Sequence, residues 1–317
     1  MSINPIELGS FWMPKASSTT AGQVDWAFDV VLWICIIFFV GLMGAMFLFA
    51  YKYRRRKEGE KTSAVSHNTT LEITWTVLPL LLLGVLFLAG LRGYANALVA
   101  PAEAIEIKVT GAKWFWTFTY PNGYVASNTL VVPKDRPVKL LMSSQDVVHS
   151  FFVPEFRIKQ DVVPGQYTTM WFQATEAKDV QVECAEYCGT SHSDMLATIT
   201  VKPEAEFKEW LEKAGDEGKG LTPAEYGQKL YTSKNCFTCH STDGSRIQGP
   251  TFKGVFGRSE ALESGSAVTV DENYIRESLM EPNAKIVKGY PAVMPTYKGT
   301  LKDKEIDALI AYLKTVK

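Results

Sequence analysis

Residues 180–201 read VQVECAEYCGTSHSDMLATITV, a loop rich in potential metal ligands between two alternating apolar segments. The alternation in VQVEC and MLATITV predicts strands. The loop carries Cys184, Cys188, His192 and Met195 at intervals of four, four and three residues. One cysteine, one histidine and a weakly binding methionine on a β-sandwich are typical of a blue-copper loop, and a second thiolate allows two copper ions to be bridged. The loop therefore predicts a binuclear copper site.

A second imidazole for this site comes from His149, in the segment SSQDVVHSFFVPEF, at the end of a different strand. Two alternatives remain open: a Cys184–Cys188 disulfide and a Cys2His2 zinc site. Neither of them accounts for Met195 or for the surrounding strands.

The flanking sequence extends the strand pattern over about a hundred residues, from 101 to 202. Further strands are expected in IEIKVT, KWFWTFTY, KLLMSS and QYTTMWFQAT, with turns at PNG, KDRP and VPG between them. Many short strands of this kind predict a β-sandwich or Greek-key barrel, here a cupredoxin-like domain.

Two apolar runs precede this domain, at residues 30–51 and 73–91. At about 1.5 Å per helical residue, either run crosses a hydrocarbon core of roughly 30 Å. We expect a transmembrane hairpin with spans at about 28–51 and 72–92. A cleaved signal peptide is the alternative for the first run, but YKYRRRK follows it where a small-residue cleavage site would stand.

The connection between the two runs contains six basic residues, whereas Lys15 alone precedes the first run. The positive-inside rule places this connection in the cytoplasm and both termini outside. Cys35 lies within the first run and is expected to be a small apolar residue there. His67, in the connection, receives no role. A net charge of −1 excludes a strongly basic nucleic-acid-binding protein.

A second motif, CFTCH at residues 236–240, lies in a C-terminal segment with helical patterning. It predicts covalent haem c attachment through Cys236 and Cys239, with His240 as an axial ligand. Met294, in an irregular proline-flanked loop, is the expected sixth ligand, whereas Met280 fits the core face of a helix. Pro250, after Gly249, is expected to accept the Nδ1 proton of His240, although a plain turn is the alternative.

These motifs divide the chain into four parts, all read from the printed sequence. An N-terminal segment and hairpin occupy residues 1–100, the strand-rich domain 101–202, a short helix with a glycine-rich linker 203–222, and an all-α cytochrome c domain 223–317. The predicted fold class is a multidomain membrane protein.

The chain resembles subunit II of haem–copper cytochrome c oxidase, fused to a class I cytochrome c domain. The resemblance rests on CxExCGxxHxxM, on DVxHSF, on GAKWFWTFTYPNG and on the hairpin, and covers about residues 25–202. It implies copper ligation by the side chains of His149, Cys184, Cys188, His192 and Met195 and by the backbone carbonyl of Glu186. It also implies magnesium binding by the Glu186 side chain, for which an ordinary polar loop residue is the alternative.

The resemblance implies two further roles, each with a plainer alternative. Trp114 matches an exposed aromatic residue that accepts electrons from cytochrome c, although tryptophan in such a strand commonly fills a core. Glu72 matches the entrance of a proton path into the catalytic subunit, although a carboxylate there also caps a helix N-terminus.

The sequence thus predicts the electron-input subunit of a proton-pumping terminal oxidase in the bacterial plasma membrane. Expected partners are catalytic subunit I, subunit III, membrane lipid and an upstream donor, either a cytochrome c or a quinol-oxidising complex, but no nucleic acid. The chain has no oxygen-reducing site of its own. Two alternatives are the equivalent subunit of a copper-containing nitric oxide reductase and a stand-alone membrane-anchored electron carrier.

Overall fold

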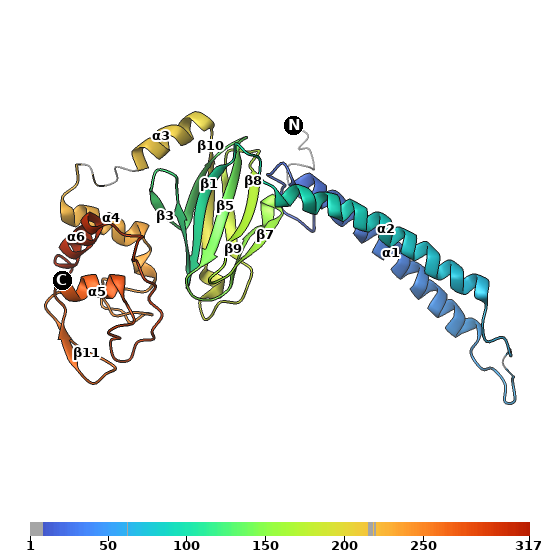
Figure 1. The fold of residues 1–317 in the computed structure, drawn as a ribbon. Coiled ribbons are helices and arrows are strands. Elements are labelled where there is room, and N and C mark those ends of the chain that lie inside the picture. Colours follow the sequence, from blue (N-terminus) through green and yellow to red (C-terminus); the bar gives the residue numbers. More distant parts are fainter. Residues whose placement is uncertain (1–8, 62, 215–217, 219) are drawn as a thin grey trace, which may run out of the picture. The chain divides into compact units, whose positions relative to one another are not determined.

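The computed structural model describes residues 9–61, 63–214, 218 and 220–317. It divides into two compact units, one formed by residues 20–99 and the other by the rest of the chain. Part of the expected glycine-rich linker, residues 215–217 and 219, lies outside the described residues. Figure 1 shows the elements of both units.

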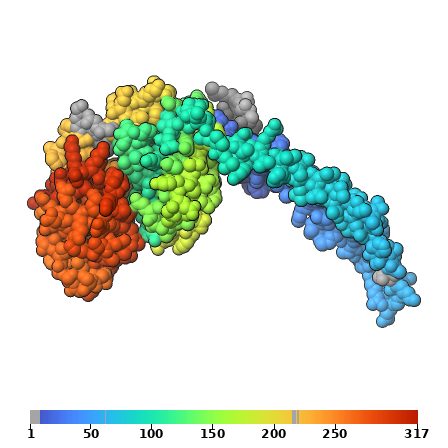
Figure 2. Space-filling view, viewed as in Figure 1, coloured from blue at the N-terminus to red at the C-terminus, as the bar shows by residue number. Residues whose placement is uncertain are grey.

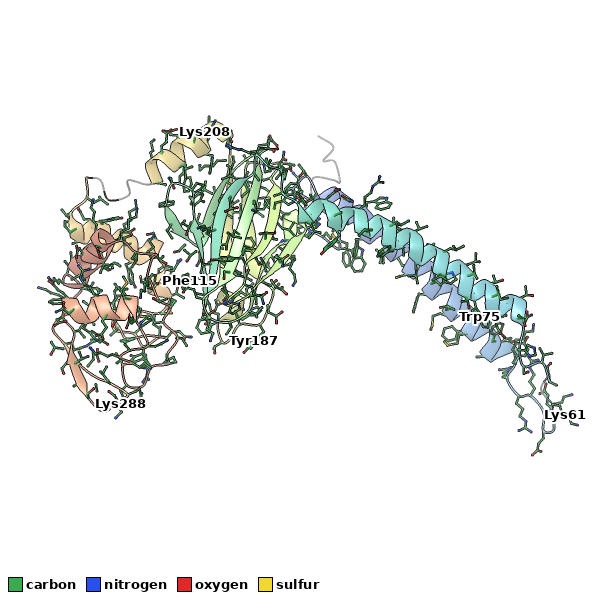
Figure 3. The ribbon with its side chains drawn as sticks, viewed as in Figure 1. Lys61, Trp75, Phe115, Tyr187, Lys208 and Lys288 are labelled. Carbon is green, nitrogen blue, oxygen red and sulfur yellow. The ribbon has the colours of Figure 1, made fainter. Side chains whose placement is uncertain are left out.

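The first unit is a pair of long helices, α1 (Ala21–Lys52) and α2 (Thr69–Leu98), which contain the two apolar runs. Both are long and apolar enough to cross a membrane, and Ala21 is the one buried residue among their described positions. Figure 2 shows one face of their surface in blue and cyan. Trp75 projects outward from α2 (Figure 3). Pro79 lies inside α2, as spanning helices tolerate.

The second unit begins with a β-sandwich of two five-stranded sheets. The first sheet has the order β3-β2-β1-β5-β8, with strands at Val125–Ser127, Phe115–Thr119, Ile105–Ala112, Pro137–Ser144 and Thr168–Gln173. The second has the order β4-β10-β9-β6-β7, with strands at Thr129–Pro133, Leu196–Lys202, Asp179–Cys184, His149–Val153 and Ile158–Val162. The predicted cupredoxin-like sandwich is confirmed, and β3, β4, β6 and β7 add to the expected strands.

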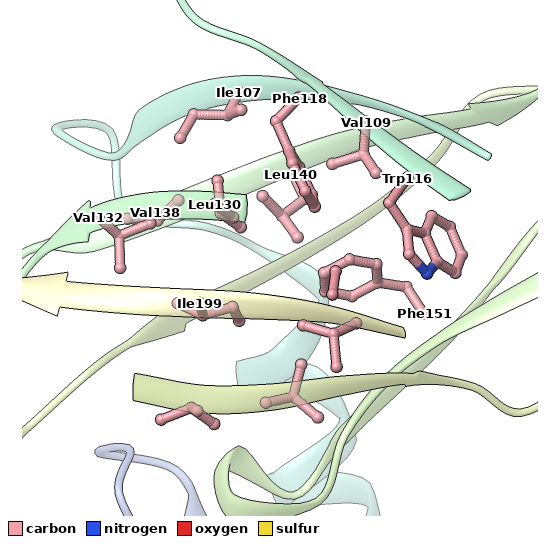
Figure 4. Close-up of a cluster of buried hydrophobic side chains, with 14 of the residues drawn as sticks. Ile107, Val109, Trp116, Phe118, Leu130, Val132, Val138, Leu140, Phe151 and Ile199 are labelled. Carbon is pink, nitrogen blue, oxygen red and sulfur yellow. The ribbon is translucent and has the colours of Figure 1, made fainter. Parts of the chain in front are cut away.

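Alternate residues of the facing strands form the core of this sandwich (Figure 4). The rings of Trp116 and Phe151, one from each sheet, meet edge to face with centroids 5.1 Å apart. Trp116, Phe118, Leu140 and Phe151 are completely buried. Burying each such side chain contributes roughly 1.5–3 kcal/mol to folding. The core therefore stabilises the packing of the two sheets against each other.

The C-terminal part is helical, as expected. It contains α3 (Glu204–Ala214), α4 (Pro223–Ser233), α5 (Glu272–Met280) and α6 (Asp303–Leu313), and a small hairpin of β11 (Ser259–Ala261) and β12 (Ala267–Thr269). Helix α4 begins with a capping box between Thr222 and Glu225.

Helices α4 and α6 pack closely because Gly227 has no side chain. A Cβ atom there would lie 1.9 Å from the carbonyl oxygen of Ala308 in α6. The close approach of the α4 and α6 backbones at Gly227 and Ala308 therefore sets the spacing of the helix pair.

Candidate metal and haem centres

The ligand loop is positioned by three neighbouring strands, β10, β9 and β6. His149 is the first residue of β6, Cys184 is the last residue of β9, and Met195 directly precedes β10. Because β6 and β9 are antiparallel, with Phe151 opposite Cys184, the start of one strand meets the end of the other. Sheet topology therefore brings His149 to the loop across 35 residues of sequence.

The expected ligand atoms converge in this loop. The Sγ atoms of Cys184 and Cys188 lie 3.8 Å apart. Each faces its own imidazole, with His149 Nδ1 3.9 Å from Cys184 and His192 Nδ1 3.5 Å from Cys188. Met195 Sδ lies 3.7 Å from the Cys188 sulfur. The paired arrangement of two thiols and two imidazoles suits two bridged metal ions.

The backbone of Glu186 completes the donor set, since its carbonyl oxygen lies 3.3 Å from the Cys184 sulfur. Cys184 and Cys188 are free thiols, so they do not form the alternative disulfide. Met195 is fully buried with its thioether against the pair. Soft sulfur donors combined with imidazole fit copper better than the hard metals, and the thioether has no place in a Cys2His2 zinc site.

The two thiols differ in acidity because they are buried together. Burial raises the pKa of Cys184, but hydrogen bonds to His149, to the backbone of Ser150 and Glu186 and to Cys188 together lower it by more, to about 6. For Cys188, burial and the neighbouring negative charge of Cys184 raise the pKa to about 12. The pKa values of the two thiols thus shift in opposite directions, and a metal ion bound by both sulfurs would displace their protons.

His149 is held in a tight polar pocket. Its ring is completely buried, and its Nε2 lies 2.9 Å from Asp146 Oδ1. On the other side, a Cβ atom at Gly111 would lie 3.0 Å from the ring, so this position of β1 leaves room for the imidazole. Burial lowers the pKa of His149, but the bonds to Asp146 and Cys184 outweigh it and raise it overall.

Trp114 lies beside the loop, but the expected exposure is wrong, because the side chain is only 6% exposed. Its indole packs against Gly189, where a Cβ atom would lie 3.0 Å from the ring. The indole Nε1 has no hydrogen-bond partner among the described residues. Trp114 thus contacts the residue after Cys188 while belonging to the sandwich core.

The loop also presents two side chains to the surroundings. The side chain of Glu186 is exposed, and Tyr187 is 76% exposed and projects from the loop (Figure 3). The backbone of Glu186 therefore faces the thiols while its carboxylate remains available to an outside ligand.

The haem motif forms a separate site around the short helix η4 (Cys236–Thr238). Cys236, Cys239 and His240 line one cavity. His240 donates a hydrogen bond from Nδ1 to the carbonyl oxygen of Pro250 at 2.7 Å, and its ring stacks on Phe252 with centroids 4.4 Å apart. The predicted contact with Pro250 is therefore present. It orients the ring so that Nε2 points away from the Pro250 carbonyl.

Gly249 gives the His240 ring its space, because a Cβ atom there would lie 2.7 Å from the imidazole. Among the described residues that line the cavity, Met294 is the single methionine. Met280 is the last residue of α5 and, although both methionines pack against the helical core, it is not among the described residues that line the cavity. Two thiols, one oriented imidazole and one thioether around an apolar cavity fit a covalently attached haem.

Glu72 lies in the first turn of α2, distant in sequence from both centres. Its Oε1 accepts a hydrogen bond from the Asn68 backbone at 3.1 Å, while Asn68 Oδ1 accepts one from Leu71. The structure thus shows the helix-capping contact, and the proton-path role stays a prediction.

Sequence reasoning missed three residues of the first site: Gly111, Asp146 and Gly189. Asp146 stands three residues before His149 in the segment that supplied the imidazole, so its proximity was a usable signal. Gly111 and Gly189 carried no such signal, because they matter only through the ring atoms that a Cβ atom at their positions would contact.

Comparison with known proteins finds family matches for the hairpin and for both domains that contain these sites. Family models match for "Cytochrome C oxidase subunit II, transmembrane domain" at residues 5–92, the periplasmic domain of the same subunit at 124–202, and "Cytochrome c" at 224–317. Cytochrome c oxidase subunit 2 of Alkalihalophilus pseudofirmus is 33% identical, over 93% of this chain and 88% of that protein. The Bacillus subtilis protein of the same name is 29% identical, over 100% and 96%.

Among solved structures, the chain is similar to the periplasmic domain of subunit II of cytochrome oxidase from Bradyrhizobium japonicum. The identity is 29% and the TM-score 0.36, over 37% of this chain and 98% of that domain.

Proposed function

The chain belongs to the cytochrome c oxidase subunit II family, and on that premise we propose that it is the electron-input subunit of a haem–copper terminal oxidase. It is a membrane protein and a subunit of an oxidoreductase, with a cytochrome c domain at its C-terminus. In the proposed route, electrons pass from a covalent haem c to a binuclear copper centre and on to the catalytic subunit, which reduces oxygen and pumps protons.

The observation that carries this proposal is the symmetric donor set of the loop. Cys184 and Cys188 face each other, and each has its own imidazole nitrogen within 3.9 Å. When bound, two copper ions would share one electron through both thiolates, which keeps geometric change on reduction small. Strand pairing positions the loop at both of its ends, because Cys184 is the last residue of β9 and Met195 directly precedes β10, while His149 begins the neighbouring β6.

The role of the haem domain follows from its covalent attachment to the same chain. A tethered donor makes electron delivery intramolecular, with an effective concentration in the mM range for a short flexible linker. Cys236 and Cys239 would hold the haem, and His240 and Met294 would bind its iron. His/Met ligation raises the reduction potential, as an acceptor from an upstream donor requires.

The remaining roles are assigned on the same premise. Trp114, in contact with Gly189 next to Cys188, would receive electrons for the copper centre. The exposed carboxylate of Glu186 would bind magnesium at the catalytic subunit. Glu72 would admit protons from the cytoplasm, where the basic connection between α1 and α2 would lie by the positive-inside rule. Both termini and both redox domains would then lie on the outer side of the bacterial plasma membrane, with subunits I and III as partners.

Purification of the complex from its membrane tests the proposal. We expect the chain to copurify with a large polytopic subunit and to contain two coppers per haem c, with a seven-line copper hyperfine pattern by electron paramagnetic resonance. A chain that purifies alone would be a stand-alone carrier. A partner with haem b and nitric oxide reduction but no oxygen consumption would identify a nitric oxide reductase instead.

A further inference from the structure

Asp146 connects two parts of the sandwich domain that are separate in sequence. It lies between β5 and β6, three residues before His149. Its Oδ1 accepts a hydrogen bond from His149 Nε2 at 2.9 Å and one from the Val147 backbone at 2.7 Å. Its Oδ2 accepts one from the backbone nitrogen of Lys113 at 2.8 Å. One carboxylate thus contacts both the imidazole and the backbone directly before Trp114.

The contact with His149 fixes which ring nitrogen is free. An ionised carboxylate can only accept, so Nε2 carries the proton and the lone pair of Nδ1 points to the Cys184 sulfur. The buried ring is also confined by Gly111. Carboxylates that accept from the second nitrogen of a ligating histidine set its tautomer and orientation and raise its basicity.

The hydrogen bond from the Lys113 backbone to Asp146 restricts the position of Trp114. Lys113 and Trp114 occupy the tight connection between β1 and β2, which has no ladder bonds of its own. Holding the Lys113 amide therefore holds the start of the next residue, whose indole packs against Gly189 beside Cys188. The Asp146 carboxylate therefore holds both His149 and the backbone before Trp114 next to the ligand loop.

We propose that Asp146 is a positioning residue, which holds His149 ready to bind copper and keeps the Lys113–Trp114 backbone in place against the ligand loop. This inference rests on the proposed function, because copper binding and electron entry are parts of it. Among the described residues, the hydrogen bonds of Asp146 are with the imidazole, with backbone nitrogens and with the hydroxyl of Ser144, and we assign it a place behind the ligands and not among them.

The test compares three variants of the full chain in the purified complex. Asp146→Ala removes every hydrogen bond of the carboxylate. Asp146→Asn keeps the shape, but its single carbonyl oxygen cannot replace both carboxylate oxygens. Asp161→Asn is the matched control, because Asp161 lies in β7 opposite Ser150 and accepts from the Ser150 hydroxyl at 2.7 Å. The variant removes one negative charge opposite Ser150, the residue next to His149, and among the described residues Asp161 forms no hydrogen bond with the imidazole.

The readouts are copper retention against a chelator, the copper hyperfine pattern, and the rate of copper reduction by haem c. For Asp146→Ala we expect copper affinity to fall roughly 10- to 100-fold, with an altered hyperfine pattern and slower copper reduction. Asp146→Asn should change all three less and in the same direction, and Asp161→Asn should match the unmodified complex.

Two results would overturn the inference. One is an Asp146→Ala complex, or, if that variant does not fold, an Asp146→Asn complex, with unchanged affinity and hyperfine pattern. The other is slower copper reduction with both of those signatures intact, which would make Asp146 a docking group for the donor domain. Absence of copper from the unmodified complex is a different failure, because it would remove the proposed function itself.

Discussion

The indole of Trp114 packs directly against Gly189, the residue that follows Cys188, so closely that a Cβ atom at position 189 would lie 3.0 Å from the ring carbon Cζ2. The contact joins the turn between β1 and β2 to the ligand loop without a hydrogen bond. The tryptophan ring can occupy this position only because residue 189 is a glycine and has no Cβ atom.

Gly189→Ala should therefore displace Trp114 and slow copper reduction by haem c. Gly189 has a φ of +125°, which also strains any other residue, so the control must share that strain. Gly165→Ala provides it, because Gly165 has a φ of +69° and open space around its Cα. Stopped-flow reduction of the two variants should differ, with Gly165→Ala close to the unmodified protein. Equal rates in both would show that the ring contact is irrelevant to electron entry.

Cys188→Ser should abolish the bridged metal pair. A serine hydroxyl stays protonated near neutral pH and is a poor ligand for a soft metal. Metal analysis should give fewer than two coppers per chain, and the seven-line hyperfine pattern should be lost. Haem c should remain reducible by an external donor, with electrons held there.

Cys35→Ser is the control for Cys188→Ser, because Cys35 lies in α1 outside both centres. It should leave copper content and spectrum unchanged. Two coppers with an unchanged spectrum in Cys188→Ser would remove Cys188 from the ligand set.

Met294→Leu should leave the haem covalently attached and lower its reduction potential, because the thioether ligand is lost while Cys236, Cys239 and His240 remain. Met280→Leu should leave the potential close to its original value, since Met280 packs in the helical core and not along the haem cavity. Redox titration of the haem absorbance separates the two. A drop confined to Met280→Leu would reverse the axial assignment.

Glu72→Gln should slow oxygen turnover several-fold while copper reduction by haem c keeps its rate. Glutamine retains an oxygen that can accept the Asn68 backbone bond, so the helix cap is preserved and only the titratable group is removed. Glu58→Gln, an exposed change in the connection between α1 and α2, should have no effect on turnover. Slowed copper reduction in Glu72→Gln would refute a role confined to proton entry.

Tyr120→Phe should destabilise the sandwich by about 1–3 kcal/mol. The Tyr120 hydroxyl donates to the Val131 carbonyl at 2.9 Å and accepts from the Val131 nitrogen at 2.7 Å, in a buried position. Removing it leaves both backbone groups without that partner. Calorimetry should show a lower transition temperature for this domain. Tyr167→Phe, at a tyrosine that is 77% exposed, should stay within about 0.5 kcal/mol, and an equal loss in both variants would contradict the explanation.

The local motifs were predictable because their chemistry is written in adjacent residues. CFTCH places two thiols and a histidine within five positions, and the two apolar runs are long enough to span a bilayer by composition alone. The spacing of Cys184, Cys188, His192 and Met195 identified the loop for the same reason. The expected exposure of Trp114 failed, because the pattern of a strand does not show which neighbours will cover a side chain.

The sequence by itself determined the order of parts, the covalent haem motif, the ligand loop and the family to which they point. Only the tertiary structure decided how distant segments meet: β6 beside β9 brings His149 to the loop, and Asp146 bridges that histidine to Lys113. The sequence had already favoured Met294 over Met280 as the haem ligand, and Met294 is the one that lines the haem cavity. The physical reason is that ligand identity depends on side-chain chemistry, which the sequence states, whereas ligand geometry depends on sheet pairing and packing between residues far apart in the chain.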